Sequence, residues 1–319
     1  MIATLIHRAR RAPHLYLTLA LLLQGFLWAH SASAQTIAVV KSRDLTTFDQ
    51  VLEGVVEACP QSSTWEFVEY NLNGKKKRGA DLAHTIRQSA PKFILALGPL
   101  AAQVSQEEFV GIPVLYCMVA NPHRYDLTGT HIGGISLDVP GAIQFARYKA
   151  MIPNLHTLGV IYDPQKSEVL VAEAAAAAAQ LGLELVRVPV SSHKQVPEAL
   201  RAMLGKIDAL WTISDDTVLT TDSFRFFLLT SFEHKLPFLA ISDIFVKVGA
   251  LATLAPQPRQ LGHQICDLMI RIEAGEIELA SFDVMPPLQA ELVVNAKTAE
   301  KIGLILPQEI LQSAGKVYK

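Results

Sequence analysis

Charged residues are scarce in this sequence, and charge of one sign is nowhere concentrated. They make up 18% of the 319 residues, and the formal net charge is −2. Residues 1–34 hold three arginines and no acid, so the remainder is more acidic, near −5. One basic run, Lys75–Arg78, follows Asn73-Gly74 and is typical of a solvated turn that leads into a helix. Nucleic-acid binding needs a concentrated basic surface, so the sequence predicts no nucleic-acid partner.

The sequence motifs of the common catalytic sites are also missing. The chain contains no P-loop, no G-x-S-x-G elbow, no H-E-x-x-H pair and no complete G-x-G-x-x-G. Its ten histidines show no spacing typical of metal ligands. We therefore predict that the protein is not an enzyme, and that it has no catalytic residue, no metal and no cofactor.

Cysteine is rare, with three residues in the whole chain: Cys59, Cys117 and Cys266. Their spacing does not resemble that of a zinc site. An oxidising compartment permits one disulfide and leaves one thiol, and the spacing favours no particular pair. Cys117 lies inside the apolar run Val114–Val119, which indicates a buried free thiol.

Long apolar runs are missing beyond the N-terminus. A charged stretch at 7–11 is followed by an apolar run of about 14 residues at 15–28 and then by Ala32-Ser33-Ala34. This order predicts a secretory signal peptide over residues 1–34, cleaved between Ala34 and Gln35. The run is shorter than the roughly 20 residues that span a bilayer, which favours cleavage over an uncleaved anchor. We expect the mature chain to be soluble and periplasmic.

The mature chain does contain a regular alternation of short apolar runs with segments of helical periodicity. Strands are expected at 36–40, 66–72, 93–97, 114–119, 132–137, 157–162, 183–188, 209–213, 238–241 and 250–254. Helices are expected at 45–58, 80–88, 100–109, 140–152, 167–181, 196–204, 224–234 and 260–274. Such alternation predicts parallel strands covered by helices.

The predicted fold class is therefore α/β, with two doubly wound parallel-sheet lobes of four or five strands each. The chain is too long for one compact core. Ligands of open α/β sheets bind beyond the carboxyl ends of the strands. Two facing sheets are thus expected to bind a ligand in the cleft between them, and to close around it by a hinge motion.

Several stretches, in their order and spacing, resemble one known family. They are Phe93–Ala102 (FILALGPLAA), Ile132–Pro140 (IGGISLDVP), Thr157–Pro164 (TLGVIYDP), Ser214–Val218 (SDDTV), Gly249–Ala252, Leu261-Gly262, Ile270–Glu276 and, most specifically, Glu291–Ile310 (ELVVNAKTAEKIGLILPQEI). Over about residues 36–310, the chain resembles the ABC-transporter substrate-binding proteins of the tryptophan/tyrosine-binding type, which have the type I periplasmic-binding-protein fold.

The resemblance implies how the chain is divided and which partners it has. Lobe 1 would comprise residues 35–135 and 256–282, and lobe 2 residues 136–255 and 283–319, joined by a hinge of three chain crossings. The implied partners are a small-molecule ligand and an ABC transporter permease with its ATPase in the inner membrane. We expect a monomer.

The candidate ligand-binding residues are those that follow the predicted strands. Asp215 and Asp216 are the leading candidates, because a carboxylate there suits the ammonium group of an amino acid; helix capping is the alternative reading. The other candidates are Ser42, Gly98, Pro99, Asn121, Asp163, Ser167, Ser242 and Asp243. Candidate aromatic walls are Tyr116, Tyr162, Trp211 and Phe245, although an aromatic residue in a buried strand is more often core.

Three of these loops depart from the pattern of the family. Pro99 stands where Thr or Ser is usual, and Asp163-Pro164 stands where Asn-Pro is usual. Asp216 replaces an Asn and adds a negative charge. Three of the candidate positions also have a purely structural reading: a tight turn at Gly98-Pro99, a cap of the turn at Asn121 and a helix N-cap at Ser167.

The sequence thus predicts an exported solute-binding protein that captures a small polar ligand and delivers it to an ABC-type importer. The first expectation is an amino acid with an aromatic or branched side chain. A periplasmic sensing module that docks on a membrane receptor would have the same fold, and this alternative stays open. A cytoplasmic sugar-responsive repressor also shares the fold, but the signal peptide and the missing helix-turn-helix argue against it.

Overall fold

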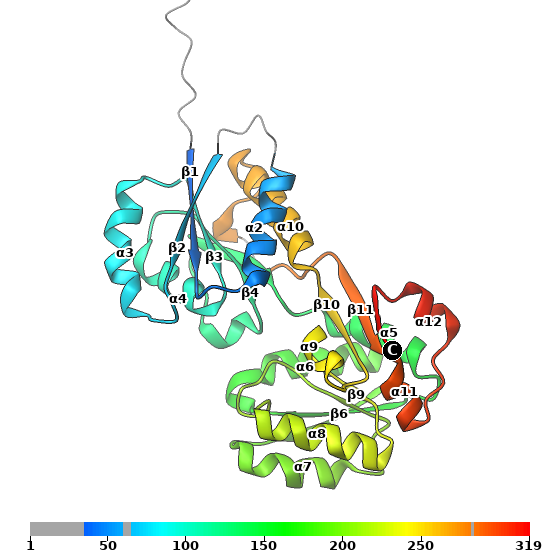
Figure 1. The fold of residues 1–319 in the computed structure, drawn as a ribbon. Helices are drawn as coiled ribbons and strands as arrows, with labels where there is room; N and C mark the ends of the chain where they lie inside the picture. The colour runs from blue at the N-terminus through cyan, green and yellow to red at the C-terminus, as the bar shows by residue number, and fades with distance from the viewer. Residues whose placement is uncertain (1–34, 60–64, 282–283) are drawn as a thin grey trace, which may run out of the picture.

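The computed structural model describes residues 35–59, 65–281 and 284–319, which form two lobes (Figure 1). The predicted signal peptide at 1–34 lies outside the described residues. Within the described residues, no helix is both long enough and apolar enough to cross a membrane. The same residues contain no cluster of His, Cys, Asp and Glu side chains that could hold a metal ion.

The first lobe is built on a parallel sheet of five strands in the order β2-β1-β3-β4-β5. The strands are β1 (Gln35–Lys41), β2 (Trp65–Asn71), β3 (Phe93–Leu97), β4 (Val114–Val119) and β5 (Ile132–Ser136). Helices α2 (Thr46–Ala58) and α10 (Pro258–Glu273) cover one face, and α3 (Lys77–Gln88) and α4 (Pro99–Glu108) cover the other. Burial on both faces explains why β3 and β4 are continuous apolar runs.

The second lobe has seven strands in the order β12-β11-β10-β9-β8-β6-β7. They are β6 (Thr157–Tyr162), β7 (Glu184–Pro189), β8 (Ala209–Trp211), β9 (Phe238–Leu239), β10 (Ala252–Pro256), β11 (Ala290–Asn295) and β12 (Lys316–Tyr318). All neighbours are parallel except β10 and β11. The expectation of four or five strands was wrong for this lobe, because the C-terminal segment adds β11 and β12 to the edge.

Helices cover both faces of the second sheet. The helices α5 (Gly141–Met151) and α6 (Pro164–Gln180) share one apolar core with the sheet, and α7 (Val196–Met203) and α8 (Thr221–His234) share the other. The short helices α9 (Asp243–Lys247), α11 (Ala296–Ile302) and α12 (Gln308–Ser313) complete the lobe. The predicted α/β architecture of two doubly wound lobes is confirmed.

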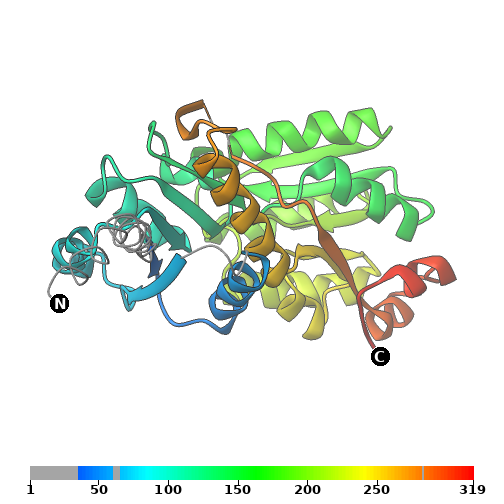
Figure 2. The same ribbon diagram turned by 90° about the horizontal axis from the view of Figure 1, so that it is seen from above.

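The chain passes between the lobes three times, as expected. It leaves the first sheet after β5, returns from β10 to α10, and leaves again after a 3-10 turn, Leu279–Ser281, to enter β11 (Figures 1 and 2). The third crossing pairs with the end of β5, because the Ser136 N–H donates to the Met285 carbonyl at 2.9 Å. The residue limits of the two lobes stay a prediction.

Helix α10 lies in the second half of the sequence but packs on α2 of the first lobe (Figure 2). The two backbones touch at two glycines: a Cβ on Gly262 would lie 2.1 Å from the Val51 carbonyl oxygen, and one on Gly54 would lie 2.1 Å from that of Arg259. A disulfide joins Cys59, which directly follows α2, to Cys266 of α10, with Cα atoms 5.6 Å apart. The expected single disulfide is therefore this pair, and Cys117 is the buried free thiol.

Candidate functional site

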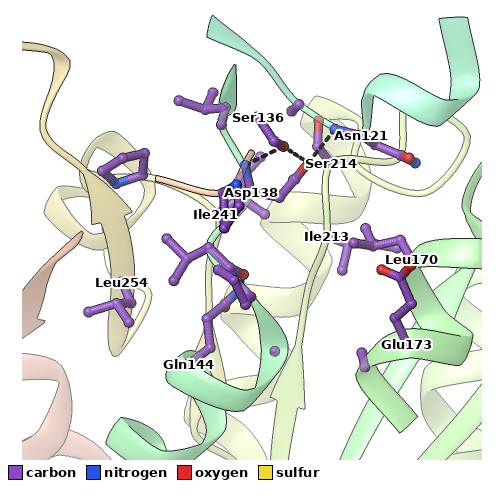
Figure 3. Close-up of a pocket in the computed structure, with 18 of the residues that line it drawn as sticks. Asn121, Ser136, Asp138, Gln144, Leu170, Glu173, Ile213, Ser214, Ile241 and Leu254 are labelled. Carbon is purple, nitrogen blue, oxygen red and sulfur yellow. Dashed lines mark hydrogen bonds between the residues drawn. The ribbon is translucent and has the colours of Figure 1, made fainter. Parts of the chain in front are cut away.

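A cavity of about 490 Å³ lies between the two sheets, beyond the carboxyl ends of their strands (Figure 3). Segments that follow β4, β5, β8 and β9 line it, together with α6, the end of β10 and the third crossing. Both lobes therefore contribute to its wall. The position agrees with the inter-lobe cleft expected from the alternation of strands and helices.

Much of the cavity wall is apolar. Its apolar residues include Leu170, Ala174 and Ala177 of α6, Ile213 after β8, Ile241 after β9, and Leu254 of β10. Trp211 also lines it, and its position is fixed by two contacts. Its indole N–H donates to Oε1 of Gln144 at 3.1 Å. Its ring packs edge-on against that of Phe145, with ring centroids 4.9 Å apart. A rigid apolar wall of this kind suits the hydrocarbon part of a ligand.

Asp138 supplies a carboxylate to the cavity from the first crossing (Figure 3). Its Oδ2 accepts hydrogen bonds from the backbone N–H of Asn121 and from Ser136 Oγ, the latter at 2.8 Å. Both hydrogen bonds end on Oδ2, and no described residue donates a hydrogen bond to Oδ1. Burial raises the pKa of Asp138 above its usual value, although these hydrogen bonds oppose the shift. An incoming cation would relieve that cost.

The N-terminus of α5 also faces the cavity, three residues after Asp138. Gly141 and Ala142 line the wall, and the first backbone N–H groups of a helix have no partner within it. Gly141 sits close to α6, since a Cβ there would lie 3.3 Å from Cα of Ala174. Free N–H groups beside a cavity suit a carboxylate. The crossing thus offers groups for both charges of a zwitterion.

Asn121 and Ser242 are the two predicted site residues that line the cavity. Asn121 adopts a left-handed conformation, with φ of 47°, that Asn tolerates better than most residues. Its side-chain amide donates to the Lys166 carbonyl of the second lobe at 2.9 Å. Ser242 precedes α9, and its side chain makes no capping hydrogen bond. Its hydroxyl is therefore available to a ligand.

Asp163, Ser167 and Asp215 lie together in a buried cluster that does not line the cavity. Asp215, 1% exposed, accepts from the Asp163 N–H and from Ser167 Oγ, both at 2.8 Å. Asp163 caps α6 by accepting from the Gln165 N–H at 3.0 Å, so the N-cap is Asp163 and not Ser167. These contacts join the loops after β6 and β8, which are neighbouring strands. Ligand contact by the three residues stays a prediction.

Asp216 forms ion pairs within the protein. Arg124 of the first lobe donates to its Oδ2 at 2.8 Å, and Lys166 of the second lobe donates to its Oδ1 at 2.6 Å. The hydrogen bond from Lys166 and the charge of Arg124 lower the pKa of Asp216. The carboxylate expected to receive a ligand ammonium thus already has two cationic partners.

Four other candidates lie away from the cavity in the described structure: Ser42, Gly98, Pro99 and Asp243. Ser42 Oγ accepts from the Ala101 N–H at 2.9 Å and so satisfies the start of α4, with Pro99 at its first position. Gly98 has φ of 88°, and a Cβ there would lie 2.8 Å from Ser42 Oγ. These contacts match the tight-turn reading. Asp243 accepts hydrogen bonds from the side chains of Lys316 and Tyr318, and these bonds tie β12 to the start of α9.

Of the four aromatic candidates, Trp211 is the one that lines the cavity. Tyr116 lies in the core of the first lobe, and Phe245 packs on Phe224 with ring centroids 4.5 Å apart. Tyr162 donates to Glu168 at 2.9 Å. Core packing therefore explains Tyr116 and Phe245, as the general preference for buried aromatics suggests.

The candidate residues named from the sequence leave out six polar residues of the cavity wall: His123, Ser136, Asp138, Gln144, Glu173 and Ser214. Ser136 and Asp138 belong to the stretch Ile132–Pro140, which carried the resemblance but was assigned to a crossing strand. Ser214 directly precedes the two aspartates that were chosen. Attention to the residues on either side of each strand end would have found these three. Gln144 and Glu173 lie inside helices and carried no such signal.

Comparison with known proteins identifies the family. The sequence model of the family described as ABC transporter substrate binding protein matches residues 36–318. The chain belongs to this family. The resemblance found in the sequence is thus confirmed, and the match spans both lobes. The family is named for binding a transported substrate rather than for converting one.

A curated relative, the tyrosine-binding protein of Clostridioides difficile strain R20291, is 24% identical over 226 residues. The match covers 66% of this chain and 63% of that protein. The aligned region therefore spans less than two thirds of the relative's length.

Solved structures show the same fold. One is described as an ABC domain in complex with L-Trp from Streptococcus pneumonia; its TM-score is 0.64 and its identity 22%, over 89% of this chain and 100% of that chain. Another is the ligand-free, open structure of CD0873, a substrate-binding protein with adhesive properties from Clostridium difficile. Its TM-score is 0.72 and its identity 20%, over 89% and 99% of the two chains. At these identities the likeness shows the fold alone.

Proposed function

We propose that this protein captures an α-amino acid in the inter-lobe cavity and delivers it to an ABC importer. The observation that carries the proposal is the juxtaposition, within five residues of the first crossing, of a carboxylate and a helix N-terminus that both line the cavity. Asp138 would receive the ammonium group, and the N–H groups of Gly141 and Ala142 would receive the carboxylate.

The cavity wall supports a ligand of this kind. The apolar residues of α6 and the side chains of Ile213 and Leu254 offer a surface for the ligand side chain, next to the polar crossing. A site with few placed polar groups in a mostly apolar wall is typical of small-molecule pockets. The relatives described as binding tyrosine and tryptophan support an amino acid as the ligand class.

The proposed place of action is the periplasm, reached through the signal peptide at 1–34 and cleavage between Ala34 and Gln35. The partner would be the importer's permease with its ATPase, and the protein would act as a monomer without catalysing a reaction. The lobe limits 35–135 with 256–282, and 136–255 with 283–319, belong to the same proposal. The packing of α10 on α2 supports the assignment of α10 to the first lobe.

The proposal is tested by calorimetric titration of the exported protein with the twenty common L-amino acids and their D-enantiomers. We expect at least one L-amino acid to bind, and Asp138→Asn to weaken its binding by tenfold or more, since a charged hydrogen bond contributes about 1.5–3 kcal/mol. Ser281→Ala, in an exposed turn away from the cavity, is the matched control. Binding of sugars or nucleosides without any amino acid would contradict the proposal.

A further inference from the structure

The ionisable side chains on the cavity wall are two carboxylates and the imidazole of His123. Among the described residues that line the cavity, the carboxylates are Asp138 and Glu173, and none is a lysine or an arginine. A zwitterionic ligand with an uncharged side chain brings one positive and one negative charge. The first crossing accounts for both of them, because Asp138 faces the ammonium and the start of α5 faces the carboxylate.

Glu173 is left without a role in that arrangement. It lies on α6, between the apolar residues Leu170 and Ala174 in sequence, and it lines the cavity with them (Figure 3). No described residue forms an ion pair or a hydrogen bond with its side chain. Glu173 is exposed to solvent, and it lies beside Leu170 at a different part of the cavity from Asp138 (Figure 3).

Two cations adjoin the cavity wall in sequence without lining the cavity. Arg124 directly follows His123 of the wall, and Lys166 lies in the first turn of α6, where its carbonyl accepts from the Asn121 amide. Both cations pair with Asp216, at 2.8 and 2.6 Å. Asp216 is 64% exposed and does not line the cavity. Both cations thus pair with Asp216, and neither forms an ion pair with Glu173.

We infer that the cavity selects an L-amino acid whose side chain ends in a cationic group, an inference that rests on the proposed function. The α-ammonium and α-carboxylate bind at the first crossing, the methylene chain lies along Leu170 and Ala174, and the terminal cation pairs with Glu173. Glu173 is the residue that determines specificity. An acidic side chain would meet like charge there and would be rejected.

The test compares two pairs of ligands that differ in charge at the side-chain end: L-lysine with L-norleucine, and L-arginine with L-citrulline. Calorimetric titration of the exported protein should give at least about tenfold tighter binding of the cationic member of one pair, the factor expected of one charge-assisted hydrogen bond. Glu173→Gln keeps the size of the side chain and should bring that ratio close to one without weakening the neutral member.

Glu198→Gln, which makes the same change at an exposed carboxylate of α7 that does not line the cavity, is the matched control and should preserve the ratio. Equal or tighter binding of the neutral members, or a ratio that survives Glu173→Gln, overturns the inference while the proposed function stands. If neither these four ligands nor any common amino acid binds, both the inference and the proposed function fail.

Discussion

Arg124 of the first lobe and Asp216 of the second lobe are joined across the cleft, with Nη2 donating to Oδ2 at 2.8 Å. Arg124 is mostly buried, with 14% of its side chain exposed, and it also lies over the ring of Tyr125. A second link runs alongside it from the Asn121 amide to the Lys166 carbonyl. Both links start in the loop after β4, so this loop carries the polar contacts that hold the lobes together beside the cavity.

Arg124→Gln should shift the protein towards an open form. The lost pair is partly solvated, and exposed pairs contribute about 0–1 kcal/mol, so ligand affinity should fall by about fivefold or less. Small-angle scattering of the free protein should show a larger radius of gyration. Lys166→Gln is the control, because Lys166 and Asp216 belong to the same lobe. An equal expansion in both variants would mean that the cross-lobe pair has no special part in closure.

The same cluster predicts a dependence on acid. The pKa of Asp216 lies below its usual value, chiefly through the hydrogen bond from Lys166. A lowered pKa in the folded state gives stability that is present above the unfolded pKa, near 4, and is lost as the pH falls through the folded pKa. Because Asp216 is mostly exposed, the effect is small. Between about pH 4 and pH 2, the free energy of unfolding should therefore depend less on pH in Asp216→Asn than in the wild type.

Much of the fold could be predicted from the sequence because its local signals agree with one another. The bounds of β3, β4 and β6 match the expected ranges, since each strand is a buried apolar run closed by Gly, Ala or Asp. The second sheet was harder. Its β9 has two residues, and β11 joins β10 antiparallel from a distant part of the chain. Periodicity within a window carries no information on such pairings.

The site was predicted less well than the fold. Strand ends were the right place to search, but a short polar residue at a strand end serves the backbone as readily as a ligand. Ser42, Asp163 and Asp215 show this, because each accepts hydrogen bonds from nearby backbone N–H groups. Which polar residues face the cavity depends on how the crossing at Ser136–Asp138 turns, and that is set by the packing of the lobes.

Asp215 gives a prediction about stability. Its carboxylate accepts from the Asp163 N–H, from Ser167 Oγ and from the Thr217 N–H, so Asp215→Ala leaves two buried donors and one part-buried donor without this partner. The free energy of unfolding should fall by about 3 kcal/mol or more. Urea denaturation measures this loss. Loss of affinity beyond tenfold with unchanged stability would instead favour direct contact between Asp215 and the ligand.

The disulfide predicts a separate behaviour. Cys59 and Cys266 are 207 residues apart, and their bond closes a long loop. Replacing both with serine should lower the free energy of unfolding by about 2–5 kcal/mol. Ligand affinity should change little, because neither residue lines the cavity. Denaturant titration and calorimetry of the same variant separate the two effects.

Cys117 should stay unreactive as long as the protein is folded. Burial raises the pKa of its thiol to about 12, so almost no thiolate forms at neutral pH. A thiol reagent should label no cysteine in the native protein and one cysteine after unfolding without reductant. Labelling of two or three cysteines after unfolding would mean that the pair Cys59–Cys266 had not formed.

Asp138 should cost stability in the free protein and supply affinity in the complex. Burial raises its pKa, and a raised pKa in the folded state gives stability that is present below the unfolded pKa, near 4, and is lost as the pH rises through the folded pKa. Asp138→Asn removes this penalty, while its carbonyl can still accept from Asn121 and Ser136. The variant should therefore melt at a higher temperature than the ligand-free wild type at pH 7.

The same change should weaken ligand binding tenfold or more, because the neutral amide cannot pair with an ammonium group. Saturating ligand would then raise the melting temperature of the wild type well above that of the variant. Wild-type affinity should also fall as acid protonates Asp138, whereas the affinity of Asp138→Asn should stay flat over the same range. A variant that is less stable without ligand, yet binds as tightly as wild type, would make Asp138 a structural residue of the crossing.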